Sequence, residues 1–192
     1  MRLLQETGYG LVTGDDYAVL AQRIAAIEGN DEDENDRSKI LSDSYRFQGI
    51  IGSYLGTEKG VSCTKKWIEL LVERIAKHQL KEDIDTLPIA YNEYGRALMR
   101  IPNEKKALRS WEVSSDIITK RTPPGELPFP FPWFHRALIY AFGGQADLAD
   151  SLISPILEQR ENKLGTDDTK TYEYVAKANR FPEKALTSSE RE

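Results

Sequence analysis

Small and apolar residues recur along most of this chain at intervals of three and four positions, the spacing that places them on one face of an α-helix. One such stripe consists of Ala107, Trp111, Ser114 and Ile118, at positions i, i+4, i+7 and i+11, and another consists of Trp67, Leu70, Leu71 and Ile75. The alternation of apolar and polar residues that marks a half-buried strand does not extend over any useful length. The pattern therefore predicts an all-α fold.

A register of four positions occurs three times along the chain. In each copy an aromatic residue is followed by a large apolar residue, a small residue and another large apolar residue. The copies are Phe47, Tyr54, Cys63 and Trp67; Tyr91, Leu98, Ala107 and Trp111; and Trp133, Tyr140, Ala149 and Ile153. In all four columns the second copy follows the first by 44 residues and the third follows the second by 42. Chance seldom aligns four columns in this way, so we expect repeated helical hairpins of about 40 residues each.

Capping and turn residues predict where the hairpins begin and end. Three hairpins are expected, at about residues 36–80, 86–120 and 131–164. Their helices are expected to start at Asn35 or Asp36, at Ser62, at Thr86 with Pro88, at Asn103 and at Pro132. Gly143 with Gly144, and Gly165 after a periodic run, are expected to end helices because glycine accepts the backbone conformation found there.

The remaining segments complete a single predicted domain over residues 1–180. One more packed helix is expected at about residues 15–28, a partial fourth hairpin at 168–180 and a flexible tail at 181–192. The acidic run "NDEDENDR" is interpreted as a solvated loop, because like charges repel one another. Its functional alternative is a surface that attracts a basic partner.

Charge and composition exclude several classes of function. The chain has 192 residues, a net charge of −5 and a pI near 5.3, and its basic residues are mixed with acids, so we expect no nucleic-acid partner. No apolar run approaches the ~20 residues of a membrane span, and no secretory signal is visible at the start. The single cysteine, Cys63, allows no intramolecular disulfide. A cytoplasmic protein is expected, with the nucleus as the alternative.

Candidate chemistry is sparse. The sequence contains no Walker loop, GxSxG, HExxH or GxGxxG motif. His78 has no second histidine or cysteine at metal-ligand spacing, and its place near a predicted helix C-terminus suits a surface residue. Cys63 occupies the small-residue column of the repeat and is interpreted as a core residue. We therefore expect no metal, no cofactor and no enzymatic activity.

The repeated register resembles the tetratricopeptide repeat (TPR), in the roughly 42-residue form found in kinesin light chains. The matching residues are Tyr91, Gly95, Leu98, Ala107 and Trp111 in the middle copy, and Trp133, Ala137, Tyr140, Gly144 and Ala149 in the last. The segment "LEQRENKLGTDDTKT" is similar to the linker of that family. The resemblance covers residues 38–178 and implies a right-handed superhelix of stacked antiparallel helical hairpins.

The resemblance also implies a concave groove lined by the first helix of each hairpin. The residues expected to line it are Gln48, Asn92, Arg96, Met99, Arg100, Phe134, His135 and Leu138, with Gly52 and Leu55 beside Gln48. Asn92 would hydrogen-bond a peptide backbone, Arg96 would bind a carboxylate in bidentate fashion, and Phe134 would be an apolar anchor. The alternative is that Arg96 and Arg100 are ordinary surface residues, paired with Glu93.

These features favour a non-catalytic adaptor that holds a peptide or helix of another protein in the groove. One alternative is an accessory factor or helical enzyme with a closed small-molecule pocket, for example in a fungal biosynthetic pathway. Another is a fragment of a longer TPR protein, whose end hairpins could also associate with a second copy. The run "ELPFPFPWF" is interpreted as a rigid entry that packs Phe129 and Phe131 against the hairpin before it, with a docking surface as its alternative.

Overall fold

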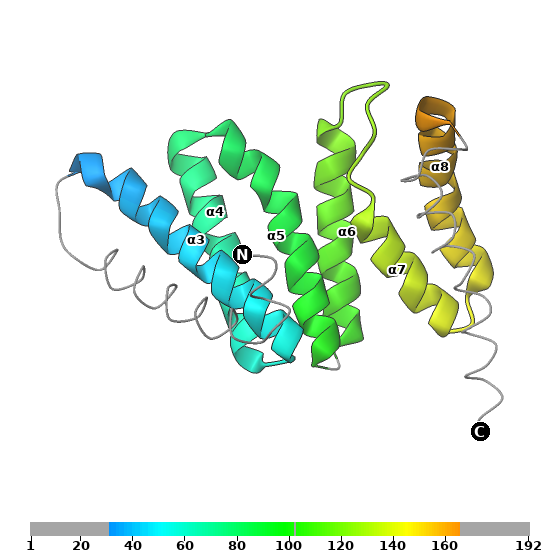
Figure 1. Ribbon diagram of the computed structural model, residues 1–192, viewed down its shortest axis with the longest axis horizontal. Helices are drawn as coiled ribbons and strands as arrows, with labels where there is room; N and C mark the ends of the chain where they lie inside the picture. The colour runs from blue at the N-terminus through cyan, green and yellow to red at the C-terminus, as the bar shows by residue number, and fades with distance from the viewer. Residues whose placement is uncertain (1–30, 102, 166–192) are drawn as a thin grey trace. The chain divides into compact units, whose positions relative to one another are not determined.

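The computed structural model describes residues 31–101 and 103–165 of the 192, with side chains from residue 34 onward. In these ranges the only regular secondary structure is helical (Figure 1), which confirms the all-α prediction. The helices are α3 (Asp31–Leu55), α4 (Glu58–His78), α5 (Lys81–Arg100), α6 (Glu104–Arg121), α7 (Phe131–Phe142) and α8 (Ala146–Leu164). The expected helix at 15–28, the partial hairpin at 168–180 and the tail at 181–192 lie outside the described residues.

Contacts divide the chain into two compact units, residues 1–110 and 111–192, so each unit is described by itself. The first unit contains α3, α4, α5 and the start of α6. The second contains the rest of α6 together with α7 and α8. The single domain and the superhelix expected from the repeats stay predictions.

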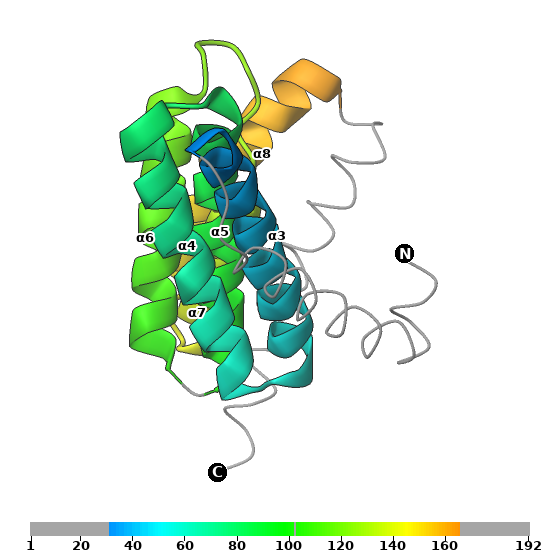
Figure 2. The same cartoon turned by 90° about the vertical axis from the view of Figure 1, so that its left-hand side faces the viewer.

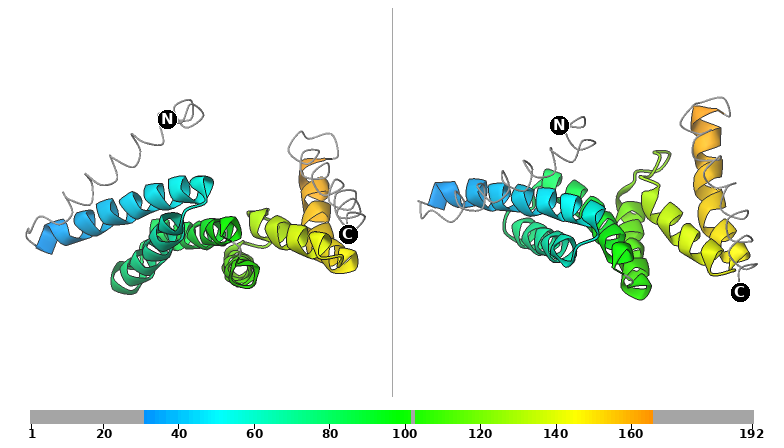
Figure 3. Two further views of the ribbon diagram at one scale, coloured as in Figure 1. Left: turned by 90° about the horizontal axis from the view of Figure 1, so that it is seen from below. Right: turned by 60° about the horizontal axis from the view of Figure 1, so that its bottom comes forward.

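In the first unit, α3 and α4 form a hairpin, and α5 packs against both of them (Figures 2 and 3). The hairpin is tight because glycines face one another across it. A Cβ atom on Gly52 of α3 would lie 2.5 Å from the Cα atom of Gly60 in α4, and one on Gly49 would meet the Thr64 side chain. Helices approach this closely only where the side chains between them are small or missing.

Large apolar residues fill the space on the other side of α4. Trp67, Ile68 and Leu71 of α4 form a buried cluster with Ala90 of α5. Tyr45, Leu87, Tyr91 and Tyr94 cover it. Trp67 and Leu71 belong to the predicted apolar stripe of this helix, so the periodicity correctly identified its buried face.

In the second unit, α7 and α8 form another hairpin. Its core consists of Phe134, Ala137, Ala141, Ala149 and Ile153, with Trp133, Tyr140 and Leu157 packed against it. Gly143 and Gly144 make the turn, and Gly165 follows α8 with a φ of 83° and donates its N–H to the Glu161 carbonyl at 2.9 Å. The predicted glycine stops of both helices are confirmed.

Three predicted helix starts are wrong. The acidic run is not a loop, because α3 begins at Asp31 and carries it in its first turns, where acidic side chains interact favourably with the helix dipole. Helix α4 begins four residues before Ser62, and the Thr57 hydroxyl caps it by accepting the Gly60 N–H at 3.2 Å. Helix α5 begins at Lys81 and contains Pro88 in its interior. Its first turn is stabilised by Asp83, which pairs with Arg74 of α4.

The proline-rich segment that leads into α7 is partly buried. Pro128 and Pro130 are buried, while Phe129 and Phe131 leave more than a third of their surface exposed. The two aromatic rings contact each other, with centroids 4.9 Å apart. Helix α7 begins at Phe131, one residue before the predicted Pro132, and the proline lies in its first turn, where the missing N–H costs no hydrogen bond.

Candidate binding surface

The C-terminal ends of α3 and α5 lie side by side and carry exposed apolar side chains. The Arg96 guanidinium of α5 lies 5.2 Å from the ring centroid of Tyr54 in α3, and a Cβ atom on Gly56 would lie 3.8 Å from the Cβ of Arg100. We call the surface formed by Tyr54, Leu55, Arg96, Met99 and Arg100 the α3/α5 face. Tyr54 is 56% exposed, Leu55 59% and Met99 40%.

Arg96 is held in place from two directions. Its Nη1 donates to both carboxylate oxygens of Glu93, at 3.1 and 3.0 Å, while the Tyr54 ring lies against its guanidinium. Burial lowers the pKa of Arg96, but the hydrogen bond with Tyr54 and the charge of Glu93 outweigh it, so that the pKa is raised overall. The pairing with Glu93 that was considered as the alternative role of Arg96 is confirmed.

This pairing limits what Arg96 can do for a ligand. A carboxylate that approached Arg96 would compete with Glu93 for the same guanidinium. Arg100, one turn further along α5, is an exposed residue of the α3/α5 face. The bidentate carboxylate contact expected of Arg96 stays a prediction, and Arg100 is the more exposed of the two residues.

Three residues predicted to line the groove in the first unit, Gln48, Gly52 and Asn92, are buried, and their placement there is wrong. Gly52 faces Gly60 of α4. Gln48 lies between α3 and α4, where its Oε1 accepts a hydrogen bond from the Cys63 thiol at 3.2 Å. Its neighbour Gly49 lets α4 approach α3 closely, and α4 then covers Gln48. Asn92 is also buried and donates to Glu93 at 3.4 Å, which leaves it supporting the Glu93–Arg96 pair.

The three groove residues predicted in α7 belong to the second unit. Phe134 is buried in the core of the α7–α8 hairpin, so the prediction of an exposed anchor is wrong. It packs with Ala137 and Ala149, whose small side chains leave space for its ring. His135 stacks on Trp111, with ring centroids 4.8 Å apart, and Leu138 is partly buried.

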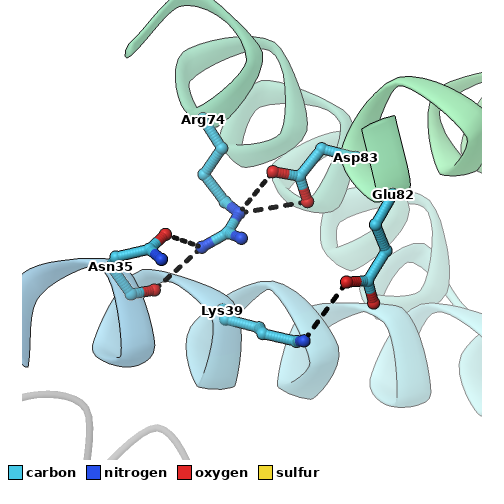
Figure 4. A network of polar contacts seen from close by, with 5 residues as sticks. All are labelled: Asn35, Lys39, Arg74, Glu82 and Asp83. Carbon is cyan, nitrogen blue, oxygen red and sulfur yellow. Dashed lines mark hydrogen bonds and ion pairs between the residues drawn. The ribbon is translucent and has the colours of Figure 1, made fainter. Parts of the chain in front are cut away.

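A polar cluster that the sequence did not reveal connects α3, α4 and α5 (Figure 4). Arg74 of α4 donates through Nε to both carboxylate oxygens of Asp83 in α5, at 3.2 and 3.1 Å. Its Nη1 donates to the backbone and side-chain oxygens of Asn35 in α3, at 2.8 and 3.1 Å. Beside it, Lys39 and Glu82 form an ion pair at 3.3 Å (Figure 4). Because the guanidinium fork bonds two other helices, this cluster fixes their positions rather than offering a reactive group.

Two hollows formed by described residues are open to solvent. One lies between α3 and α4 and is lined mainly by charged residues, among them Arg37, Glu73, Lys77 and His78. The other lies between the loop at Gly125 and α8, beside Gln159 and Lys163. His78 ends α4 as an exposed residue, as predicted, and Cys63 is buried in the hairpin.

Two further features are absent from the described ranges. Residues 31–101 and 103–165 bring no three histidine, cysteine or acidic side chains together as a metal site. In the same part of the chain, none of the helices combines the length and hydropathy that crossing a membrane requires.

Comparisons with models of protein families, with curated proteins and with solved structures gave no match to this chain.

Proposed function

We propose that this chain is a non-catalytic interaction module, built of TPR-like hairpins, that holds a peptide or helix of another protein against the α3/α5 face. The observation that carries the proposal is the gathering of Tyr54, Leu55 and Met99 at two adjacent helix ends, where all three stay exposed. Apolar side chains that are clustered and exposed, rather than scattered, are typical of a surface that another molecule covers.

Each part of the face has a separate role in this proposal. Tyr54 and Met99 supply contact area, and because each is already partly buried, covering the rest contributes only a part of the roughly 1.5–3 kcal/mol that full burial of a large apolar side chain gives. Arg100 binds a carboxylate at the rim. Glu93 holds Arg96, and the Arg96 guanidinium lies against the Tyr54 ring, so the ring is already held in position before the partner binds.

Within residues 31–101 and 103–165, the two hollows described above favour an adaptor over a protein with a closed small-molecule pocket. A pocket of the second kind is enclosed and mainly apolar, with a few convergent polar groups. Both hollows described above are open, and the one between α3 and α4 is lined mainly by charged side chains. An extended partner segment suits open surfaces of this kind better than a small apolar ligand does.

Affinity capture with matched variants tests the proposal. Immobilised wild-type chain, the double variant Tyr54→Ser with Met99→Ser, and the control Val72→Ser would each be incubated with an extract of the source cell. Val72 is an exposed apolar residue of α4 in the same unit, so its replacement removes similar surface elsewhere. A protein that binds the wild type and the control but not the double variant supports the proposal. Equal capture by all three chains, or none by any, contradicts it.

Arg96→Glu is a less informative variant. The new carboxylate would face Glu93, which is almost buried, and repulsion between them would disturb the packing of α5. Loss of binding in that variant would not separate a lost contact from a lost fold.

A further inference from the structure

The sequence contains two serine or threonine residues that are followed directly by proline, and the structure places them differently. Thr122–Pro123 comes immediately after α6, which ends at Arg121. Ser154–Pro155 lies in the interior of α8. The two dipeptides thus share their local chemistry but not their backbone conformation.

The segment that follows Thr122 is an exposed turn. Pro123, Pro124, Gly125 and Glu126 are all exposed, and the Glu126 N–H donates to the Pro123 carbonyl at 3.0 Å. Gly125 has a φ of 82° and no atom near the place where a Cβ would stand. In Figure 1 this segment leaves the end of α6 and loops outward before α7. A second protein can reach it without disturbing a packed core.

Thr122 itself stands at the boundary between helix and turn. Its N–H and its hydroxyl both donate to the Ile118 carbonyl, each at 2.8 Å. A residue that precedes proline disfavours the helical conformation and prefers an extended one. Lys120 and Arg121, directly before Thr122, are exposed basic residues.

We propose that Thr122 is a phosphorylation site for a proline-directed protein kinase. Such an enzyme binds its substrate in an extended conformation, with the acceptor hydroxyl next to proline. Thr122–Pro123 supplies the dipeptide, and because Thr122 follows the last residue of α6, only its bonds to Ile118 have to open for the segment to extend. In the reaction the Thr122 oxygen attacks the γ-phosphorus of ATP, the bond from that phosphorus to the ADP oxygen breaks, and the hydroxyl proton passes to the base of the kinase. The products are ADP and phosphothreonine at position 122.

The phosphate would act on the end of α6. The modified oxygen could no longer donate to Ile118, and two negative charges would lie beside the last carbonyl groups of the helix, at the negative end of its dipole. We therefore expect the last turn of α6 to loosen. Lys163 of α8 donates to the Gly125 carbonyl at 2.6 Å, so the change would reach the contact between this loop and α8.

Ser154 serves as a control built into the same chain. It is exposed, but its backbone is helical and its hydroxyl donates to Asp150 at 2.8 Å. To enter an extended binding cleft, Ser154 would first have to unwind the middle of α8. Because local opening of a packed helix costs free energy, we expect Thr122 to be phosphorylated at least about tenfold faster than Ser154.

The test incubates the full chain with a purified proline-directed kinase and magnesium ATP, with the activity of the enzyme verified on a standard peptide in the same reaction. Intact mass and peptide mapping then follow phosphate at each position in the wild type, Thr122→Val and Pro123→Ala. We expect one phosphate at Thr122, none at that position in the valine variant, and much slower transfer in the alanine variant. Phosphate missing from Thr122, or entering Ser154 equally fast, would overturn the proposal.

Hydrogen exchange provides the second readout. Amides in the last turn of α6 should exchange about two- to fivefold faster in the phosphorylated chain than in the unmodified one, from the size of charge effects at helix ends. Unchanged exchange there would overturn the effect on α6. The proposal is independent of partner binding at the α3/α5 face.

Discussion

Gly52 of α3 and Gly60 of α4 meet backbone to backbone, and this contact sets how closely the first hairpin closes. A Cβ atom on Gly52 would lie 2.5 Å from the Gly60 Cα and 2.6 Å from its nitrogen, and a Cβ on Gly60 would collide with the Gly52 carbonyl carbon. Neither neighbour is a flexible side chain that could move aside. The hairpin therefore requires glycine at both positions.

Gly52→Ala should destabilise the chain. Alanine favours a helix over glycine by roughly 0.5–1 kcal/mol, but forcing α3 and α4 apart costs more, so we expect a net loss of about 1–3 kcal/mol. Urea denaturation followed by circular dichroism measures it. Gly143→Ala is the matched control, because its Cβ would meet nothing closer than 3.4 Å. An alanine at position 52 that left the unfolding midpoint unchanged would show that the backbones do not touch.

Because the Arg74–Asp83 pair is buried, replacing Asp83 should lower stability far more than replacing its neighbour Glu82. The side chains of the pair are 3% and 9% exposed, whereas those of Lys39 and Glu82 are 49% and 70% exposed. Removing one partner of a buried pair typically costs about 3–5 kcal/mol, and removing one of an exposed pair less than about 1 kcal/mol. Asp83→Asn should therefore destabilise the chain far more than Glu82→Gln does in the same denaturation experiment.

A double variant separates the charge of this pair from its packing. Arg74→Met with Asp83→Leu removes both charges, so it leaves no uncompensated ion and should be less destabilising than Asp83→Asn alone. Equal losses for Asp83→Asn and Glu82→Gln would mean that the network of Figure 4 does not hold the helices together.

The ion pairs of Lys77 predict a dependence of stability on pH. Lys77 bonds Glu73 at 2.9 Å and Glu34 at 3.1 Å. The hydrogen bond from Lys77 lowers the pKa of Glu34 below its ordinary 4.5, and the hydrogen bonds to Glu73 and then Glu34 raise the pKa of Lys77 above 10.5. A lowered acid pKa means that the folded state binds fewer protons, so this contribution is present above about pH 4.5 and is lost as the pH falls further.

Lys77→Met tests this dependence. In the variant, the unfolding midpoint should fall less steeply below about pH 4.5 than it does in the wild type. Because the groups are exposed, the difference should be small and should shrink at high salt. Parallel pH profiles for the two chains would show that these pairs contribute nothing.

The burial of Ala149 predicts that the α7–α8 hairpin does not tolerate a larger side chain at this position. Ala149 is buried against Phe134, Ala137 and Ile153. Ala149→Trp should overpack this core and destabilise the chain by at least about 1–3 kcal/mol, whereas Ala146→Trp, at an exposed position one turn earlier, should have little effect. Thermal melts of the two variants make the comparison. An unchanged melting temperature for Ala149→Trp would remove Ala149 from the packing interface.

The features that could be predicted from the sequence are those set by local chemistry. Helical periodicity identified Trp67 and Leu71 as core residues, and glycine conformation identified the ends of α7 and α8. The acidic run is helical and not a loop, because the dipole of α3 favours acidic side chains in its first turns despite their mutual repulsion. Lys77 and Arg74 of α4 also bond Glu34 and Asn35 in that segment.

Residues of the candidate surface were harder to predict, because exposure depends on neighbouring helices. Gln48 lies between α3 and α4 and Asn92 is also buried, so neither faces solvent as the helical projection predicted. Tyr54 appeared only as a column of the repeat, while its exposure beside Arg96 depends on the spacing between α3 and α5. The Arg74–Asn35 contact joins residues 39 apart in sequence, which no local pattern specifies.

Site-specific photocross-linking tests the central claim most directly. A benzophenone amino acid would replace Met99 on the α3/α5 face in one chain and Val72 on α4 in another, since both positions are exposed. After irradiation in an extract of the source cell, we expect a discrete cross-linked protein from position 99 and none from position 72. The same adducts from both positions, or no adduct from position 99, would contradict the assignment of the α3/α5 face as the binding surface.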